Sequence, residues 1–178
     1  MCRTEQVSDR LDAVPATAED LQLLRDDPAR FERTRGLRVE PGWSPFNGAL
    51  DGALEMLERG VPPQWATHLF VHRSDAAVVG IGGFTGPPVE GTVEIGYAIA
   101  PAYRRGGLAT EAATQLLQAA ARGGAETVRA HTLAQDSPST RVLVRLGFRR
   151  TEEIHDPQDG PVWRWERPTR SPAPGEQE

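Results

Sequence analysis

The chain has 178 residues, of which 38% are hydrophobic, and it carries a formal net charge of −5 at pH 7. This length predicts one domain around one core, and the charge gives no basic signature for nucleic-acid binding. All 20 residues counted as Lys or Arg are arginine, which excludes the P-loop, pyridoxal phosphate and protein kinase chemistries that depend on a lysine.

The sequence contains no stretch that predicts insertion into a membrane. No run of about 18 apolar residues occurs, and the polar start MCRTEQVSDR lacks the apolar segment of a signal peptide. Cys2 is the only cysteine, so no internal disulfide can form. We therefore expect a cytoplasmic protein that does not bind a membrane.

The N-terminal third predicts one strand followed by helices. Residues 1–9 are expected to be flexible, and residues 10–16 to form a short first strand. Thr17 is expected to cap a helix that breaks or restarts at Asp27-Pro28, and a further helix ends near Gly60. The apolar residues expected to face inward from these helices are Leu21, Leu24, Phe31, Leu50, Leu54 and Leu57.

Two strands follow, from Ala66 to His72 and from Ala76 to Phe84. His68 and His72 fall on the same face of the first of these strands. Because two such residues lie roughly 13 Å apart in a strand, they are too far apart to share one metal ion. We expect no metal site.

The most informative stretch runs from residue 92 to residue 110 and predicts a strand, a tight turn and a helix. Large apolar residues at alternate positions face one side of the strand. The other side carries small residues, and Glu94 is its only carboxylate. Pro101 ends the strand, and Arg104-Arg105-Gly106-Gly107 turns the chain into a helix that ends at Gly123-Gly124. Unpaired helix amides, glycines and two arginines favour an anion such as a diphosphate, while an ordinary turn with solvated arginines is the alternative.

The remaining chain predicts a strand, a short helix and a closing hairpin. The strand from Thr127 to Leu133 is reached through a helix, so it is expected to run parallel to the central strand. Ser137 caps a helix through Leu146, and residues 148–154 and 162–166 form the hairpin. The domain is expected to span residues 10–167, and residues 168–178 to form a disordered tail.

Two segments resemble motifs of the GNAT N-acetyltransferases. Arg104-x-x-Gly107-x-Ala109 resembles the R/Q-x-x-G-x-G/A pyrophosphate loop with which that family binds acetyl-CoA. Residues 136–143, DSPSTRVL, followed by LGF at residues 146–148, resemble the N-x-x-S-x-R-V-L...L-G-F segment of the RimJ/RimL-like branch. The two motifs stand in the family's order, and the resemblance covers residues 11–167.

The resemblance implies an α/β (α+β mixed), GNAT-like single domain with a mixed, partly open β-sheet and helices on both faces. Two central parallel strands would splay apart around the pantetheine arm of acetyl-CoA, which is the implied co-substrate, and no metal is implied. Asp136 stands where the family usually has an asparagine, and an aspartate cannot donate a hydrogen bond unless protonated. The implied cofactor-binding residues are Ala98, Ile99, Ala100, Arg104, Arg105, Gly106, Gly107, Leu108, Ala109, Thr110, Asp136 and Ser139.

Acetyl transfer to an amine needs a proton acceptor, because only about one alkyl amine in a thousand is neutral at pH 7. Glu94 is the candidate base, and a structural glutamate is the alternative. Ser139 matches the motif serine and is the candidate for assisting the leaving sulfur. Leu143 stands where many relatives carry a tyrosine, so Tyr97 or water are the other candidates. His131 could also be a base, but a hydrogen-bonded strand histidine is the alternative.

In the resembling family the N-terminal helical region overlies the acceptor site. Trp43 and Phe46 are therefore candidate substrate-binding residues together with Glu94, and Trp65 is a further candidate. Core packing of these aromatic side chains is the alternative.

The predicted function is direct transfer of an acetyl group from acetyl-CoA to a primary amine of a small molecule or of a protein N-terminus. One alternative is a catalytically inactive acyl-CoA-binding regulatory module of the same fold. A second alternative is a phosphate-ligand binding protein that shares only the turn. The sequence does not decide whether the protein forms a homodimer.

Overall fold

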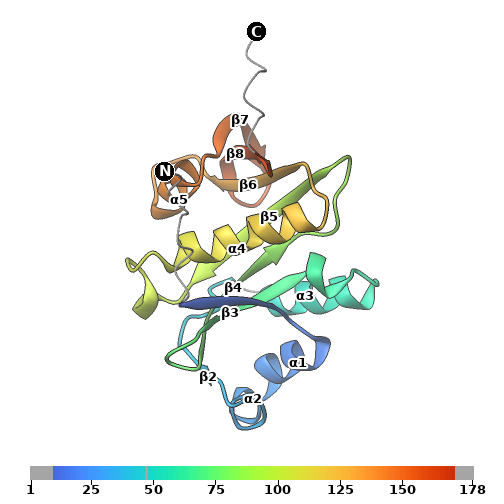
Figure 1. Cartoon of the computed structure of the whole chain (residues 1–178), viewed down its shortest axis with the longest axis vertical. Coiled ribbons are helices and arrows are strands. Elements are labelled where there is room, and N and C mark those ends of the chain that lie inside the picture. The colour runs from blue at the N-terminus through green and yellow to red at the C-terminus, as the bar shows by residue number, and fades with distance from the viewer. Residues whose placement is uncertain (1–9, 47, 171–178) are drawn as a thin grey trace, which may run out of the picture.

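The computed structural model describes residues 10–46 and 48–170, within which eight strands form one mixed sheet (Figure 1). The predicted flexible residues 1–9 and the tail residues 171–178 lie outside the described residues. The strands are β1 (Leu11–Pro15), β2 (Arg38–Val39), β3 (Thr67–His72), β4 (Ala77–Phe84), β5 (Thr92–Ile99), β6 (Thr127–Leu133), β7 (Arg149–Asp156) and β8 (Gly160–Pro168).

The sheet is open, with the strand order β1-β3-β4-β5-β6-β8-β7 and with β2 paired to β4. The pairings of β5 with β6 and of β2 with β4 are parallel, and the others are antiparallel. This arrangement confirms the predicted mixed, open sheet. The helices of the described residues are α1 (Ala18–Asp26), α2 (Pro28–Arg35), α3 (Ala49–Glu58), α4 (Leu108–Arg122) and α5 (Pro138–Arg145), with short 3₁₀ turns η1 (Pro63–Trp65) and η2 (Pro101–Tyr103).

Helices pack on both faces of the sheet, because successive strand residues point to opposite sides. Phe70 of β3 and Val79 of β4 belong to a core with α4 and α5, whereas Leu69 and Val78 belong to a second core with α1, α2 and α3. Figure 1 shows α4 lying across the middle of the molecule, between the group of α1, α2 and α3 and the hairpin of β7 and β8. The central strand β5 pairs with β4 on one side and with β6 on the other, so it connects the N-terminal and C-terminal strands of the sheet.

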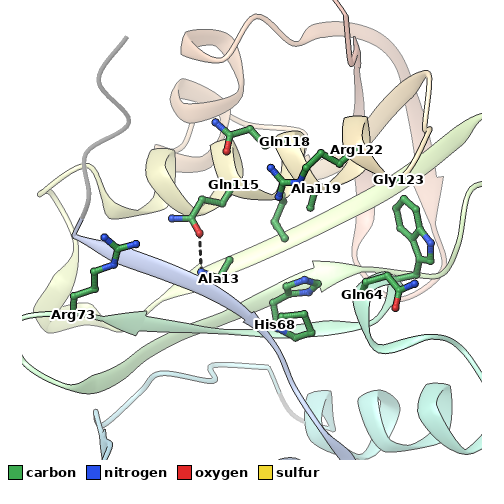
Figure 2. A pocket seen from close by; sticks show the side chains of 12 residues that line it. Ala13, Gln64, His68, Arg73, Gln115, Gln118, Ala119, Arg122 and Gly123 are labelled. Carbon is green, nitrogen blue, oxygen red and sulfur yellow. Dashed lines mark hydrogen bonds between the residues drawn. The ribbon is translucent and has the colours of Figure 1, made fainter. Parts of the chain in front are cut away.

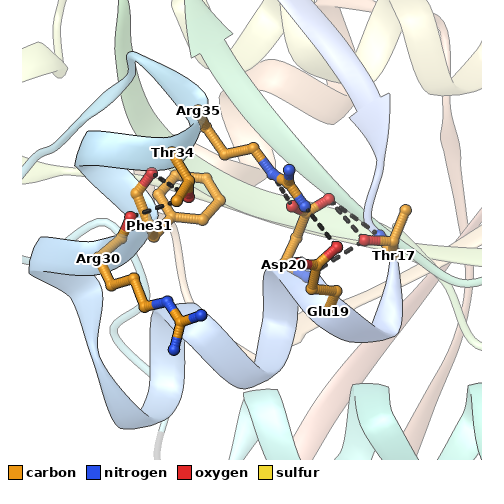
Figure 3. A network of polar contacts seen from close by, with 7 residues as sticks. All are labelled: Thr17, Glu19, Asp20, Arg30, Phe31, Thr34 and Arg35. Atoms are coloured by element: carbon orange, nitrogen blue, oxygen red, sulfur yellow. Dashed lines mark hydrogen bonds and ion pairs between the residues drawn. The ribbon is translucent and has the colours of Figure 1, made fainter.

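The first two helices begin as the sequence predicts. The Thr17 side chain accepts a hydrogen bond from the Asp20 backbone in a capping box, and Asp27 caps α2, which starts at Pro28. Arg35 at the end of α2 donates to Asp20 over 2.6 Å, which ties the two helices together (Figure 3). The restart at Asp27-Pro28 thus places both helices on the same face.

Two features of the fold differ from the expectation. The strand β2 was not predicted, because two residues carry no periodicity. At the other end, β8 continues to Pro168, and Thr169 donates from its backbone N–H to the Glu126 carbonyl over 2.8 Å. The ordered chain therefore extends past residue 167, where we expected the domain to end.

Candidate active site at the split between two parallel strands

The strand β5 leaves its parallel neighbour β6 after a short stretch of pairing. Only Thr92, Val93 and Glu94 of β5 pair with β6, opposite residues 127–129. The following residues of β5, from Ile95 to Ile99, pair with β4 on the other side. A gap therefore opens between β5 and β6 beyond Glu94, as the resemblance predicted.

The backbone of β5 presents alternate residues to this gap. The backbone C=O of Glu94 accepts from the backbone N–H of Thr85, which follows β4, over 3.1 Å. The backbone N–H of Ala100 donates to the C=O of Val79 in β4 over 2.7 Å. Because backbone groups alternate along a strand, Tyr97 and Ile99 direct their N–H and C=O groups toward the β6 side. Of the predicted cofactor residues at the end of β5, Ile99 thus faces the gap.

The turn after β5 leaves the start of α4 without a side-chain cap. Gly107 is the N-cap with φ +83°, and Arg105 also has a positive φ of +66°. The first backbone hydrogen bond of α4 runs from Glu111 to Gly107 over 3.1 Å. The amides of residues 108–110 therefore lie at the positive end of the helix with no capping side chain, which is the geometry of an anion site.

Arg104 connects this turn to the gap. Its Nε donates to the Ile99 carbonyl over 2.9 Å, which bends the side chain back toward the end of β5. A residue that the sequence analysis did not select, Arg10, also reaches the turn and donates to the Gly106 carbonyl over 2.7 Å. The two arginines hold the turn from different parts of the chain.

Glu94 lies beside His131 on the face of the sheet opposite α4. The Glu94 Oε1 atom and the His131 Nδ1 atom are 3.0 Å apart. Arg164 approaches the other ring nitrogen, Nε2, with its Nε at 3.4 Å. Because Arg164 can only donate, this contact favours the tautomer in which His131 Nδ1–H donates to Glu94. The two candidate bases therefore form one pair rather than independent sites.

Tyr97 offers a buried hydroxyl group. The hydroxyl has no hydrogen-bond partner within the described residues, and burial raises its pKa above the usual value. A neutral phenol without a partner can donate a proton or a hydrogen bond to a ligand. The other candidates on this side differ: Ser139 and Asp136 are exposed, and Leu143 is buried in the core.

A small pocket of about 180 Å³ lies over β4 and β5, on the face that carries Glu94. Gly82 and Gly96 contribute to its walls together with Phe46, whose side chain is 59% exposed. Trp43 lies elsewhere: it is buried in the core of α1, α2 and α3 and does not line this pocket. Of the two predicted aromatic substrate-binding residues, Phe46 is thus at the pocket, and the packing alternative describes Trp43.

A larger pocket of about 660 Å³ lies between β1, β3 and the C-terminal half of α4 (Figure 2). Trp65 lines it and packs edge-to-face against Phe84 at a centroid distance of 5.0 Å, so Trp65 has a core role. His68 also lines it, with Nδ1 3.1 Å from the Ala66 carbonyl, and burial lowers the pKa of His68. None of the residues predicted to bind the cofactor lines this pocket.

Within residues 10–46 and 48–170, no group of three or more His, Cys, Asp and Glu side chains is placed to hold a metal ion. No helix in this part of the chain has the length and apolar character needed to cross a bilayer.

An open mixed sheet, split between two parallel strands beside an uncapped helix start, matches the architecture implied by the sequence motifs. A family model described as "Acetyltransferase (GNAT) domain" matches residues 10–149. The chain therefore belongs to the GNAT acetyltransferase family. Among curated proteins, none matches the sequence.

Solved structures with this fold include RimL, the ribosomal L7/L12 alpha-N-protein acetyltransferase in complex with coenzyme A. It has 15% identity and a TM-score of 0.65, over 91% of this chain and 96% of that chain. The ribosomal-protein-S5-alanine acetyltransferase from Vibrio fischeri has 12% identity and a TM-score of 0.65, over 90% and 94% of the two chains. The microcin C7 self-immunity acetyltransferase MccE, in complex with acetyl-CoA and AMP, has 12% identity and a TM-score of 0.63, over 92% and 94%.

The family match confirms the predicted enzyme class, the structures confirm the fold, and the MccE structure contains acetyl-CoA, the co-substrate that the resemblance implies. The RimJ/RimL-like branch that the second motif indicates stays a prediction, because the likeness to the RimL and ribosomal-protein-S5 structures, at 15% and 12% identity, shows the fold. The roles of individual residues stay predictions.

Proposed function

We propose that the protein is an acetyl-CoA-dependent N-acetyltransferase that transfers the acetyl group directly to a primary amine of a small molecule or protein N-terminus. The observation that carries this proposal is the Glu94–His131 pair, 3.0 Å apart, at the point where β5 and β6 separate. A carboxylate in this position lies between the proposed cofactor gap and an acceptor pocket. It can therefore accept a proton from the amine, a step that catalysis requires and that simple binding of acetyl-CoA does not.

The cofactor is proposed to bind along β5 and the turn that follows. The amides at residues 108–110 and the arginines at 104 and 105 would hold the diphosphate, since uncapped helix amides and guanidinium groups both favour anions. The pantetheine arm would lie in the gap, where the backbone of Tyr97 and Ile99 is directed. Asp136 and Ser139, both exposed near the start of α5, would contact the arm from the other wall.

Glu94 is the proposed base. The acceptor enters mostly as an ammonium ion, and Glu94 would accept one of its protons directly or through a water molecule. His131 donates its Nδ1–H to one carboxylate oxygen, which orients the group and leaves the second oxygen for the acceptor. The amine nitrogen then attacks the thioester carbon, and a backbone N–H in the gap stabilises the oxyanion.

Breakdown of the intermediate breaks the C–S bond and releases an amide and CoA. The departing thiolate needs a proton, and the attacking nitrogen, which is cationic after attack, must lose its second proton. We propose that the Tyr97 hydroxyl donates to the sulfur and regains a proton from this nitrogen through water, while Glu94 releases its proton to solvent. Burial keeps the Tyr97 hydroxyl protonated at neutral pH, and it has no partner among the described residues that would compete for it. Ser139 is the second candidate for this step, although its exposure makes solvent an equal competitor.

The acceptor is proposed to occupy the small pocket over Gly96. Phe46 would shield it from solvent, and Glu94 lies two residues from Gly96 on the same face of the strand, about 7 Å away. An amine held here lies close to the proposed base, and an apolar group beside it would contact Phe46. We infer that this surface accounts for acceptor choice.

The test is acetyl-CoA-dependent thiol release with a panel of amines: peptides with different first residues, a polyamine and an aminoglycoside. Glu94→Gln should lower turnover by about 100-fold or more and leave acetyl-CoA affinity unchanged. Glu166→Gln is the matched control, because Glu166 lies on the same face and is ion-paired with Arg129 at 2.8 Å. Binding of acetyl-CoA without turnover of any amine would instead favour the inactive regulatory module.

A further inference from the structure

Arg10 joins two parts of the cofactor turn although it lies about a hundred residues away in the sequence. Its Nη2 donates to the Gly106 carbonyl over 2.7 Å, and its Nε donates to Glu111 Oε1 over 2.8 Å. The same guanidinium also forms an ion pair with Glu111. Arg10 precedes β1, so this contact ties the edge of the sheet to the start of α4.

The hydrogen bond to Gly106 fixes the orientation of a peptide that could otherwise turn over. In a planar trans peptide the C=O and the following N–H point in opposite directions. Because Arg10 holds the Gly106 carbonyl, the N–H of Gly107 points away from Arg10. A Gly-Gly peptide has little intrinsic preference between orientations, so an external contact is needed to select one.

Glu111 depends on the same arginine. Its carboxylate lies in the first turn of α4, and the residue is only 7% exposed. Its Oε2 atom is buried and has no hydrogen-bond partner among the described residues, whereas Oε1 is held by Arg10. A buried carboxylate is stable only when its charge is compensated, so removal of Arg10 would destabilise the present position of this helix turn.

We propose that Arg10 is a positioning residue for acetyl-CoA: by holding Gly106 and Glu111, it presets the turn from Arg104 to Leu108 in the conformation that binds the diphosphate. This inference rests on the proposed function of that turn. Arg10 lies outside both sequence motifs, and it acts through the loop rather than on the acetyl group. Without it, a smaller fraction of molecules would hold the competent loop, and the apparent affinity would fall by that fraction.

The experiment compares Arg10→Ala with Arg73→Ala. Arg73 is a matched control, because it is an exposed arginine near the same end of β1 and pairs with Asp12 over 2.6 Å. We expect Arg10→Ala to weaken acetyl-CoA binding by about tenfold and Arg73→Ala to leave it within about twofold. Binding of S-acetylpantetheine, which lacks the diphosphate, should be unchanged in both variants. An equal loss for both acetyl donors, or for both variants, would overturn the inference.

Arg10→Lys separates positioning from charge. Lysine keeps the positive charge that compensates Glu111 but not the planar fork that reaches Gly106 and Glu111 together, so this variant should bind acetyl-CoA more weakly than the wild type. Full affinity in Arg10→Lys would mean that only the charge matters and would contradict the positioning role.

Amide hydrogen exchange supplies a readout without ligand. The amide of Glu111, which donates to the Gly107 carbonyl, and the amides of the next turn of α4 should exchange faster in Arg10→Ala than in the wild type or in Arg73→Ala. Unchanged exchange would refute the role of Arg10 in holding the loop. If the wild-type protein fails to bind acetyl-CoA, the proposed function fails, while the exchange data still decide whether Arg10 orders this turn.

Discussion

Gly96 offers the sharpest test of where the acceptor binds, because a side chain can be added there without disturbing the fold. A Cβ built on Gly96 meets no heavy atom within 4 Å, and the residue lines the small pocket near Phe46. Replacement by valine fills part of that pocket and suits a strand better than glycine does. We expect stability to stay equal or to rise by about 0.5–1 kcal/mol, since glycine costs conformational entropy in a strand.

The effect on catalysis should be large. A displacement of a bound reactant by about 1 Å can cost about 100-fold in rate, and the valine methyl groups would occupy the proposed acceptor position. Gly96→Val should therefore lower kcat/KM for the amine by about 100-fold while the Kd for acetyl-CoA stays within about twofold. Thiol release, calorimetric titration and thermal unfolding measure the three quantities. Full turnover with a stable Gly96→Val protein would refute the assignment of this pocket to the acceptor.

Gly82 of β4, which pairs with Tyr97 of β5, serves as the structural contrast. A Cβ on Gly82 would lie 2.5 Å from the Gly96 carbonyl oxygen and 2.5 Å from the Phe70 ring. Gly82→Ala should therefore destabilise the protein by about 1–3 kcal/mol, although alanine is the smaller substitution. A melting temperature equal to that of the wild type would show that the strands can move apart more easily than this packing implies.

Two further predictions concern buried groups. Tyr97→Phe removes a hydroxyl without a partner, so stability should not fall, while turnover should drop by about 100-fold if that hydroxyl protonates the thiolate; unchanged turnover would transfer the role to Ser139 or water. Burial lowers the pKa of His68 below its usual 6.5, despite the opposing hydrogen bond to Ala66, so the unfolded chain binds a proton first as pH falls. Stability due to neutral His68 is thus present above pH 6.5 and is lost below it, by up to about 1.4 kcal/mol per pH unit. His68→Asn should flatten this slope in melts between pH 5 and pH 8, and equal slopes for both proteins would contradict the argument.

The elements that carry the site could be predicted because their signals are local. Alternating residues define β5, the glycines and arginines define the turn, and helical spacing defines α4, whose start at Leu108 the structure confirms. The capping serine Ser137 follows from a short-range pattern, and the parallel strand β6 follows from its connection to β5 through a helix. Fold and cofactor loop therefore follow from residues near each other in the sequence.

The contacts that complete the site could not be predicted, because they join distant residues. Nothing near Arg10 indicates that it reaches Glu111, and that contact depends on where β1 lies beside α4. Glu94 and His131 were each candidates for the base, but only the register of β5 and β6 brings them within 3.0 Å. Trp43 is buried and Phe46 is exposed, and this difference likewise depends on packing between segments that are distant in the sequence.

Calorimetric titration of the purified protein with acetyl-CoA tests the central claim most directly, with CoA and pyrophosphate as separate titrants. The account predicts saturable binding of acetyl-CoA with one site per chain, and much weaker binding of pyrophosphate, because the gap between β5 and β6 adds contacts to the pantetheine arm. Pyrophosphate binding of equal strength would contradict the account and favour a phosphate-ligand protein with this fold, and absence of acetyl-CoA binding would contradict it and leave the ligand unknown.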